Sequence, residues 1–301
     1  MAPQAAPLHA LTVVGVRYRG SRPAPGDERC LDTFRASGVY EQAGVPASIV
    51  EPAMPEAERR SDEPDNLGLI GGAIADAVAA ARHSGHAVLM TGGDCSHITG
   101  VVGGLQDAHG ANTRIGLVWF DAHGDFNTPN TTLSGMLGGM PVAVAAGLAY
   151  PFWREASHIV APLPTNRIVM VDVRNLDAPE EQLMRATDVT IARVAPEFPG
   201  QDLEQAVARL ADACDMIYLH IDSDILDERF VPNHGTREPG GPDMEQVRTA
   251  IDTVMATGKV VALAVVSVYG EGQGADVSRA SGVDLIRHGL ESWRQYGTLA
   301  T

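Results

Sequence analysis

The feature that most constrains this fold is the alternation of short apolar runs with longer amphipathic segments. Runs rich in valine and isoleucine, with the length of strands, occupy residues 11–18, 87–90, 115–120, 168–173, 216–221 and 260–268. Continuous runs of this kind are typical of strands buried on both faces of a sheet. Helical periodicity follows between them, for example at 67–84, 203–213, 244–257 and 277–296. The pattern predicts an α/β protein with a mainly parallel sheet covered by helices.

Length and composition narrow the function classes. No linker or repeat divides the 301 residues, and the Pro- and acid-rich stretch 51–65 is predicted to be an exposed excursion, so we expect a single domain over 1–301. The net charge of −16 disfavours nucleic-acid binding. The three cysteines lie far apart, which is typical of a reducing compartment. We find no leader segment at the N-terminus and no apolar run long enough for a membrane span, so we expect a cytoplasmic protein.

Ionisable side chains gather where three of the predicted strands end. Because the carboxyl ends of parallel strands meet at one edge of a sheet, we expect these side chains to lie close together. Buried carboxylates without partners would be costly or would take up protons, and a pair of divalent cations such as Mn²⁺ is the simplest way to hold several of them. Taken alone, a DxHxD motif is also compatible with a helix cap, and DxD is common; three such strand ends together favour metal binding. The residues are Cys95 and His97 after the first of these strands, Asp121, His123 and Asp125 after the second, and Asp222 and Asp224 after the third.

Four segments carry a family resemblance. GGDCSH, WFDAHGDFNTP, SGMLGGMP and HIDSDILDERFVPNHGTREPGG resemble, in this order, the signatures of the ureohydrolases, which include arginase, agmatinase and formimidoylglutamase. The resemblance implies a three-layer α/β/α arginase-like fold with a mainly parallel eight-stranded sheet. It also implies a homo-oligomer, a trimer or hexamer, with two Mn²⁺ ions per subunit and a small guanidine or amidine as substrate.

The resemblance also implies residue roles at the metal centre. Asp121 and Asp222 resemble carboxylates that bridge both ions, His123 and Asp224 resemble further ligands of one ion, and Asp125 and Cys95 would complete the other. The ions activate a water that attacks the guanidine carbon. Asp125, with His123 as the second catalytic residue, would then protonate the departing amine.

The resemblance also implies roles for some residues that would bind the substrate. Asn127 and Ser134 match positions that bind an α-carboxylate, although loop capping would also explain them. Asp177, with Glu180 nearby, matches the acid that meets an α-amino group, and Thr236 matches a position beside the substrate. Together they favour a substrate with an amino-acid tail over agmatine.

Three positions depart from the family pattern. Cys95 stands where the family has a histidine ligand, Gly138 where it has a histidine at the rim of the site, and Ser267 where it has a glutamate that pairs with the guanidinium. Cys95 is either a thiolate ligand or a small buried apolar residue that leaves one metal weakly held. His97 could replace it as a ligand, but we expect His97 to begin the following helix.

These departures leave several functions open. The loss of the acid at Ser267 favours a guanidine less basic than arginine, and one branch of the family, with cysteine at the Cys95 position, hydrolyses Nω-hydroxy-L-arginine. The leading hypothesis is a dinuclear manganese hydrolase that cleaves a C–N bond of a linear amidine or guanidine. Its alternatives are an Nω-hydroxy-L-arginine amidinohydrolase specifically, a catalytically silent arginase-fold protein, and a deacylase with one metal.

Two further histidines have separate interpretations. His234 lies in a loop predicted to overhang the metal site, where it could replace the missing rim histidine. His220 lies on a predicted strand and is expected to be a satisfied core residue or to support a metal ligand.

Overall fold

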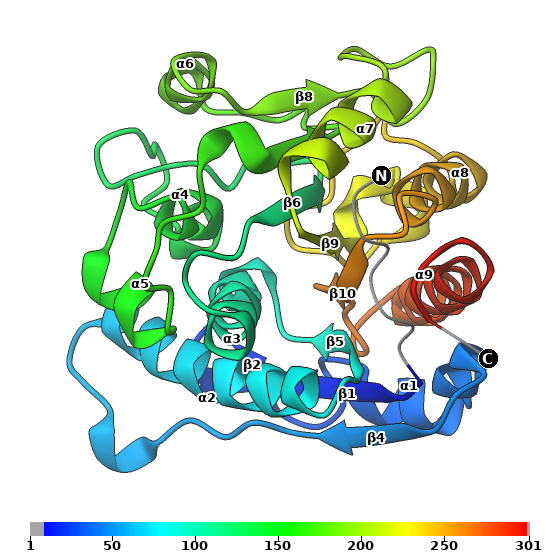
Figure 1. The fold of residues 1–301 in the computed structure, drawn as a ribbon, viewed down its shortest axis with the longest axis horizontal. Helices are drawn as coiled ribbons and strands as arrows, with labels where there is room; N and C mark the ends of the chain where they lie inside the picture. The colour runs from blue at the N-terminus through cyan, green and yellow to red at the C-terminus, as the bar shows by residue number, and fades with distance from the viewer. Residues whose placement is uncertain (1–8, 300–301) are drawn as a thin grey trace.

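A parallel sheet of eight strands forms the centre of the molecule in the computed structural model, which describes residues 9–299 (Figure 1). The strand order is β4-β1-β5-β10-β9-β6-β7-β8, and every neighbouring pair in it is parallel. This arrangement confirms the predicted mainly parallel eight-stranded sheet. The strands are β1 (Leu11–Val16), β4 (Ala47–Val50), β5 (Ala87–Gly92), β6 (Ile115–Phe120), β7 (Ile168–Val171), β8 (Thr190–Ala192), β9 (Met216–Asp222) and β10 (Val260–Val266).

The six apolar runs all contain strands of this sheet, and the two remaining strands lie at its edges. β4 is exposed along its whole length and β8 has three residues, so neither carries the apolar run of a strand buried on both faces. The predicted strand at 11–18 is too long. β1 ends at Val16, and the next residues form a short antiparallel ribbon of β2 (Tyr18–Arg19) and β3 (Arg22–Pro23).

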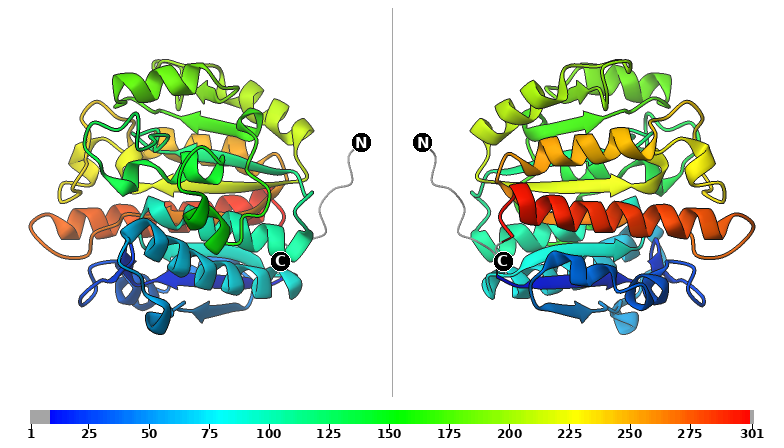
Figure 2. Two further views of the ribbon diagram at one scale, coloured as in Figure 1. Left: turned by 90° about the vertical axis from the view of Figure 1, so that its left-hand side faces the viewer. Right: turned by 90° about the vertical axis from the view of Figure 1, so that its right-hand side faces the viewer.

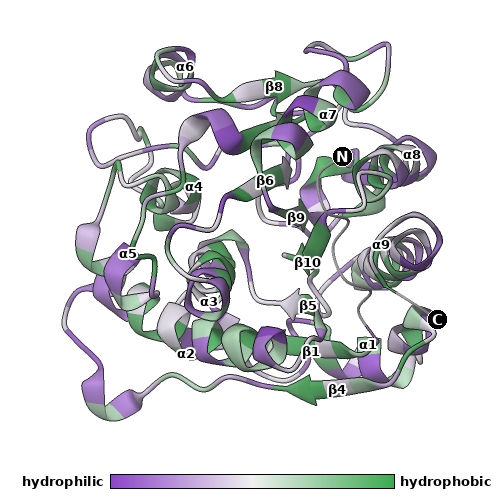
Figure 3. Cartoon of the chain, in the orientation of Figure 1, coloured by the Kyte–Doolittle hydropathy of each residue, from purple (hydrophilic) through white to green (hydrophobic). Residues whose placement is uncertain are grey.

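Helices cover both faces of the sheet, as the predicted three-layer fold requires (Figure 2). One face carries α2 (Glu63–His83), α3 (Ile98–His109), α4 (Pro141–Ala145), α5 (Pro151–Ala156) and α6 (Ala178–Arg185), and the other carries α1 (Leu31–Ala36), α7 (Leu203–Ala213), α8 (Met244–Met255) and α9 (Ala275–Tyr296). Two apolar cores result, one on each side of the strands, and the apolar colouring concentrates along the sheet (Figure 3). Asp202 and Asp243 cap α7 and α8, which begin at the predicted residues because each carboxylate accepts a backbone N–H of the first turn.

Close packing requires glycine on α3, where this helix contacts α2 and the residue that follows α5. A Cβ added at Gly100 would lie 2.5 Å from the carbonyl oxygen of Gly71, and one added at Gly103 would lie 1.7 Å from that of Ser157. These glycines let α3, which directly follows the Cys95–His97 turn, lie with its backbone against that of its neighbours.

None of the helices within residues 9–299 is long and apolar enough to cross a membrane. The predicted absence of a leader concerns residues that fall largely outside those described. The single domain over 1–301 also stays a prediction.

Candidate metal centre and substrate cavity

The site lies at the carboxyl ends of four strands that are neighbours in the middle of the sheet. β5, β10, β9 and β6 follow one another in the strand order, and the chain leaves each of them into the same cavity of about 560 Å³. Each of the six predicted metal-site residues lines this cavity, together with Asn127, Ser134, Asp177 and Thr236. The prediction that ionisable groups meet at one sheet edge is confirmed.

A tight turn carries Cys95 from β5 into the site. Gly92 and Gly93 have φ values of 75° and 61°, the left-handed region that favours glycine. Asp94 then caps a short 3₁₀ helix over Cys95–His97, and its backbone N–H donates to His97 Nδ1 at 3.0 Å. His97 Nε2 donates to the carbonyl of Gly20 at 2.9 Å. Both nitrogens of His97 are therefore occupied, and it leads into α3 as predicted.

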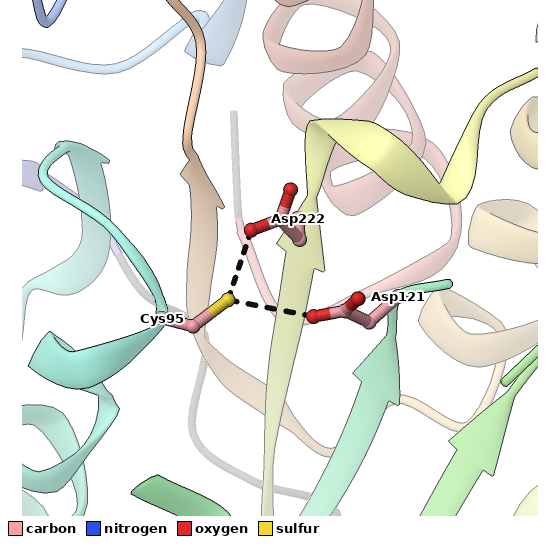
Figure 4. A group of neighbouring side chains, drawn as sticks. All are labelled: Cys95, Asp121 and Asp222. Atoms are coloured by element: carbon pink, nitrogen blue, oxygen red, sulfur yellow. Dashed lines mark hydrogen bonds between the residues drawn. The ribbon is translucent and has the colours of Figure 1, made fainter. Parts of the chain in front are cut away.

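The first potential metal-binding group, which we name the Cys95 half-site, contains Cys95, Asp121 and Asp222 (Figure 4). The Cys95 Sγ lies 2.9 Å from Asp222 Oδ2 and 3.4 Å from Asp121 Oδ2. Burial, reinforced by both carboxylates, raises the pKa of the Cys95 thiol well above its usual value. Without a cation the sulfur therefore keeps its proton and donates it to Asp222.

The second group, the His123 half-site, contains Asp121, His123 and Asp224. His123 Nδ1 lies 3.2 Å from Asp121 Oδ1 and 3.3 Å from Asp224 Oδ2. Burial lowers the pKa of His123, but the two carboxylates outweigh it and raise the pKa to about 12. Asp121 belongs to both groups, as a carboxylate shared by two ions would. Burial and the charges of Asp224 and Asp222 raise its pKa.

A third group consists of Asp222, Asp224 and His234. His234 is 3% exposed, and its Nε2 lies 3.3 Å from Asp222 Oδ1 without forming a hydrogen bond. Its Nδ1 accepts the backbone N–H of Thr236 at 3.2 Å. The loop after β9 thus reaches over the carboxylates as the sequence predicts, and it adds a histidine that was absent from the predicted ligand set.

Asp125 lies in the same cavity but outside these three groups. Within each group, the ligand atoms lie within 4.8 Å of one another. The backbone of Asp125 is left-handed, with φ 47°, an unfavourable conformation for a residue with a side chain. Two backbone N–H groups, from Val142 and Ala143, donate to its carbonyl. Burial, with the charge of Asp121, raises the pKa of Asp125 well above its usual value. The site therefore contains a carboxylic acid that can hold a proton.

The residues present suit divalent cations. Asp121, Asp222 and Asp224 are at most 4% exposed and share few cationic partners. Buried carboxylates in such numbers are costly unless a cation balances them. The unpartnered Nε2 of His234, aimed at Asp222, is a second sign of a missing positive charge. Oxygen and imidazole donors suit Mn²⁺, and the thiol adds a softer donor.

The predicted substrate residues form a second cluster on one wall of the cavity. Asp177 Oδ2 accepts the Asn127 Nδ2–H at 3.3 Å and the backbone N–H of Leu133 at 3.1 Å. Asp177 also caps α6 in a reciprocal arrangement with Glu180, whose other carboxylate oxygen accepts the Phe126 N–H at 2.8 Å. Helix α6 is therefore fastened directly to the Asp125–Asn127 segment.

The remaining predicted positions lie around this cluster and the carboxylates. Ser134 lines the cavity and its Oγ accepts the Met136 N–H at 3.2 Å, while Thr236 Oγ1 donates to Asp224 Oδ2 at 3.1 Å. Thr132 also lines the cavity and was missed, because a threonine in a polar loop has no distinctive signal.

The two other departures from the family pattern also border the cavity. Ser267 follows β10 directly, is 3% exposed and has a φ of 58°. Gly138 lies at the rim, where an added Cβ would meet only Met136, at 3.9 Å. The cavity therefore has neither a carboxylate at 267 nor an imidazole at 138, although the rim has space for a side chain.

Comparisons with known proteins agree with this architecture. The Arginase family matches residues 52–290. The arginase of Bacillus caldovelox is 29% identical over 259 residues, which cover 81% of this chain and 86% of that protein. The arginase of Eremothecium gossypii is 32% identical over 216 residues, covering 70% of this chain but only 53% of that protein, about half of its length.

Solved structures share the fold. The native structure of Bacillus caldovelox arginase superposes with a TM-score of 0.78 at 23% identity, covering 94% of this chain and 98% of that one. Entamoeba histolytica arginase in complex with L-ornithine superposes with a TM-score of 0.79 at 20% identity, covering 94% and 99%.

Proposed function

The chain belongs to the arginase family, whose members are hydrolases of C–N bonds, and from this premise we propose that it is a two-manganese enzyme for a linear guanidine or amidine with an amino-acid tail. The observation that carries the proposal is the convergence of two potential metal-binding groups on one shared carboxylate, Asp121. A catalytically silent protein would have no use for buried, mutually repelling carboxylates in a solvent-connected cavity.

Five residues would hold the ions. Cys95, Asp121 and Asp222 would hold one ion, and Asp121, His123 and Asp224 would hold the other. Bound there, the ions would lower the pKa of a water and stabilise the charge that develops on the attacked group.

Asp125 is proposed as the acid that protonates the departing amine. Burial raises its pKa in the metal-free protein, and the hydrogen bonds that its carbonyl accepts from the start of α4 fix its backbone next to the half-sites. Asn127 and Asp177, already in contact, would orient an amino-acid tail from the neighbouring wall. Thr236 fixes Asp224 through its hydroxyl.

Among guanidines, we favour one that is less basic than arginine, such as Nω-hydroxy-L-arginine. The specific observation is Ser267: at this position the cavity has a hydroxyl and no carboxylate to neutralise a guanidinium. N-hydroxylation lowers the basicity of a guanidine, so its neutral form needs no such partner. The predicted products are ornithine and hydroxyurea.

Metal content and product analysis test the proposal together. We expect about two ions per chain after reconstitution with Mn²⁺, and faster release of hydroxyurea from Nω-hydroxy-L-arginine than of urea from arginine. Asp177→Asn should raise KM for both substrates, whereas Asp212→Asn, on the exposed face of α7, should change neither. Failure to bind any ion would refute the proposal, and one ion with cleavage of acetyl-lysine would identify a deacylase instead.

The expected homo-oligomer and cytoplasmic location belong to the same proposal. Light scattering on the purified protein distinguishes a trimer or hexamer from a monomer.

A further inference from the structure

At the Cys95 half-site, a further histidine, His220, lies next to the sulfur without belonging to any of the potential metal-binding groups. His220 lies on β9, two residues before Asp222, and is fully buried. Its Nε2 lies 3.5 Å from the Cys95 Sγ. The sulfur therefore lies within 3.5 Å of two carboxylates and an imidazole.

Neighbouring side chains fix the orientation of the His220 ring. The ring stacks on Trp119, with centroids 4.1 Å apart and an interplanar angle of 7°. Its Nδ1 lies 2.8 Å from the Tyr218 hydroxyl, which has no other hydrogen-bond partner among the described residues. With one face covered and one nitrogen occupied, Nε2 is directed at the sulfur.

The direction of the hydrogen bonds between Cys95, His220 and Tyr218 follows from which of these groups carries a proton. A cysteine that binds a metal is a thiolate and has no proton to donate. The bond between sulfur and Nε2 must then run from N–H to S, so Nδ1 accepts the proton of the Tyr218 hydroxyl. Every polar atom in this buried chain of three residues is satisfied when the sulfur is ionised.

We infer that the two half-sites bind different metals. The His123 half-site, with oxygen and imidazole donors, takes Mn²⁺, and the Cys95 half-site takes a thiophilic divalent ion of the zinc or cobalt type, with His220 as the positioning residue of the thiolate. Thiolate donors favour such ions over Mn²⁺, which prefers oxygen. The inference rests on the proposed function, since it assumes that both half-sites bind metal, and it replaces Mn²⁺ by the thiophilic ion at the Cys95 half-site alone.

Cobalt is the probe, because a thiolate bound to Co²⁺ gives a charge-transfer absorption in the near ultraviolet. The protein is stripped with a chelator and equilibrated with one equivalent of Co²⁺ and an excess of Mn²⁺, because Co²⁺ binds most protein sites more tightly than Mn²⁺ does, and metal content per chain and absorption are then measured. We expect about one ion of each kind per chain and the charge-transfer band. Cys95→Ser should lose the band, while Cys214→Ser, another buried cysteine that lies outside the cavity, should keep it.

The positioning role of His220 has its own spectroscopic test. His220→Phe keeps an aromatic ring on Trp119 but removes the N–H, so the sulfur becomes a better electron donor and the band should move to longer wavelength. His220→Gln, which returns an N–H near the same place, should move it back. A purely structural role for His220 would leave the wavelength unchanged in protein that still folds.

The outcomes separate this inference from the proposed function. Two Mn²⁺ ions per chain in the presence of Co²⁺, or bound Co²⁺ without the band, would overturn the inference and leave the two-metal enzyme standing. A single ion in total would overturn it as well, because the Cys95 half-site would then be empty. No bound metal at all would refute the proposed function itself. The wild-type count and spectrum decide between these outcomes even if a variant does not fold.

Discussion

Arg174 is predicted to hold in place the loop after β9, which contributes Asp224 and His234 to the site. Its guanidinium pairs with Asp172, whose side chain is 2% exposed, and Nη1 and Nη2 also donate to four backbone carbonyls. Removing it leaves a buried carboxylate without its partner, a change that costs about 3–5 kcal/mol. The carbonyls add to this loss, because they are left without a donor. They belong to Asp224, Ile225, Leu226 and Glu238, at 3.0–3.3 Å.

The substitution Arg174→Met tests this reasoning in metal-free protein, where bound ions do not add to stability. We expect the free energy of unfolding in urea, followed by tryptophan fluorescence and circular dichroism, to fall by about 3–5 kcal/mol. Arg185→Met is the matched control: Arg185 forms an exposed i,i+4 pair with Glu181, worth about 0.5 kcal/mol or less. A loss for Arg174→Met that equals the loss for the control would refute the assigned role.

Three other predictions concern packing, protonation and thiol access. Gly103→Ala should destabilise the fold by at least about 1–3 kcal/mol, because the new Cβ would lie 1.7 Å from the Ser157 carbonyl, whereas Gly139→Ala, with open space around it, should be near neutral in the same urea titration. Metal binding should release protons and weaken as the pH falls, because the raised pKa values of Asp121 and of the Cys95 thiol keep both ligands protonated in the metal-free protein, and both must lose the proton to bind a cation. Calorimetry in two buffers of different ionisation enthalpy measures the release, and equal heats would contradict it. Burial raises the pKa of all three cysteine thiols, so a thiol reagent at neutral pH should label native protein slowly and denatured protein at three sites, and rapid labelling of the native form would contradict the burial.

The central strands and their functional ends could be predicted because burial on both faces leaves a strong pattern. A run such as 115–120 can carry no charge, so the first charged residue after it, Asp121, marks the sheet edge. The edge strands could not be predicted in this way. β4 is paired on one side only and is exposed, so nothing in its four residues demands an apolar sequence.

Contacts between segments that are distant in the chain also could not be predicted from the sequence. The predicted ligand set omitted His234, because its approach to Asp222 depends on how the loop after β9 folds back. His220 was expected to be core or to support a ligand, and nothing in a strand sequence says that its ring faces the residue at 95, which is 125 positions earlier. Periodicity assigns a side chain to a face of a sheet but does not identify its neighbour on the next strand.

The place of β10 in the sheet has a consequence for synthesis on the ribosome. β10 is the last described strand in the chain, yet it lies between β5 and β9 and pairs with both. Until residues 260–266 leave the exit tunnel, the nascent chain can form only two separate sheets, each with an open apolar edge where β10 will insert. Cys95 emerges with one of these sheets and Asp121 and Asp222 with the other, so the metal centre closes only after residues 260–266 have emerged and β10 has joined the two sheets.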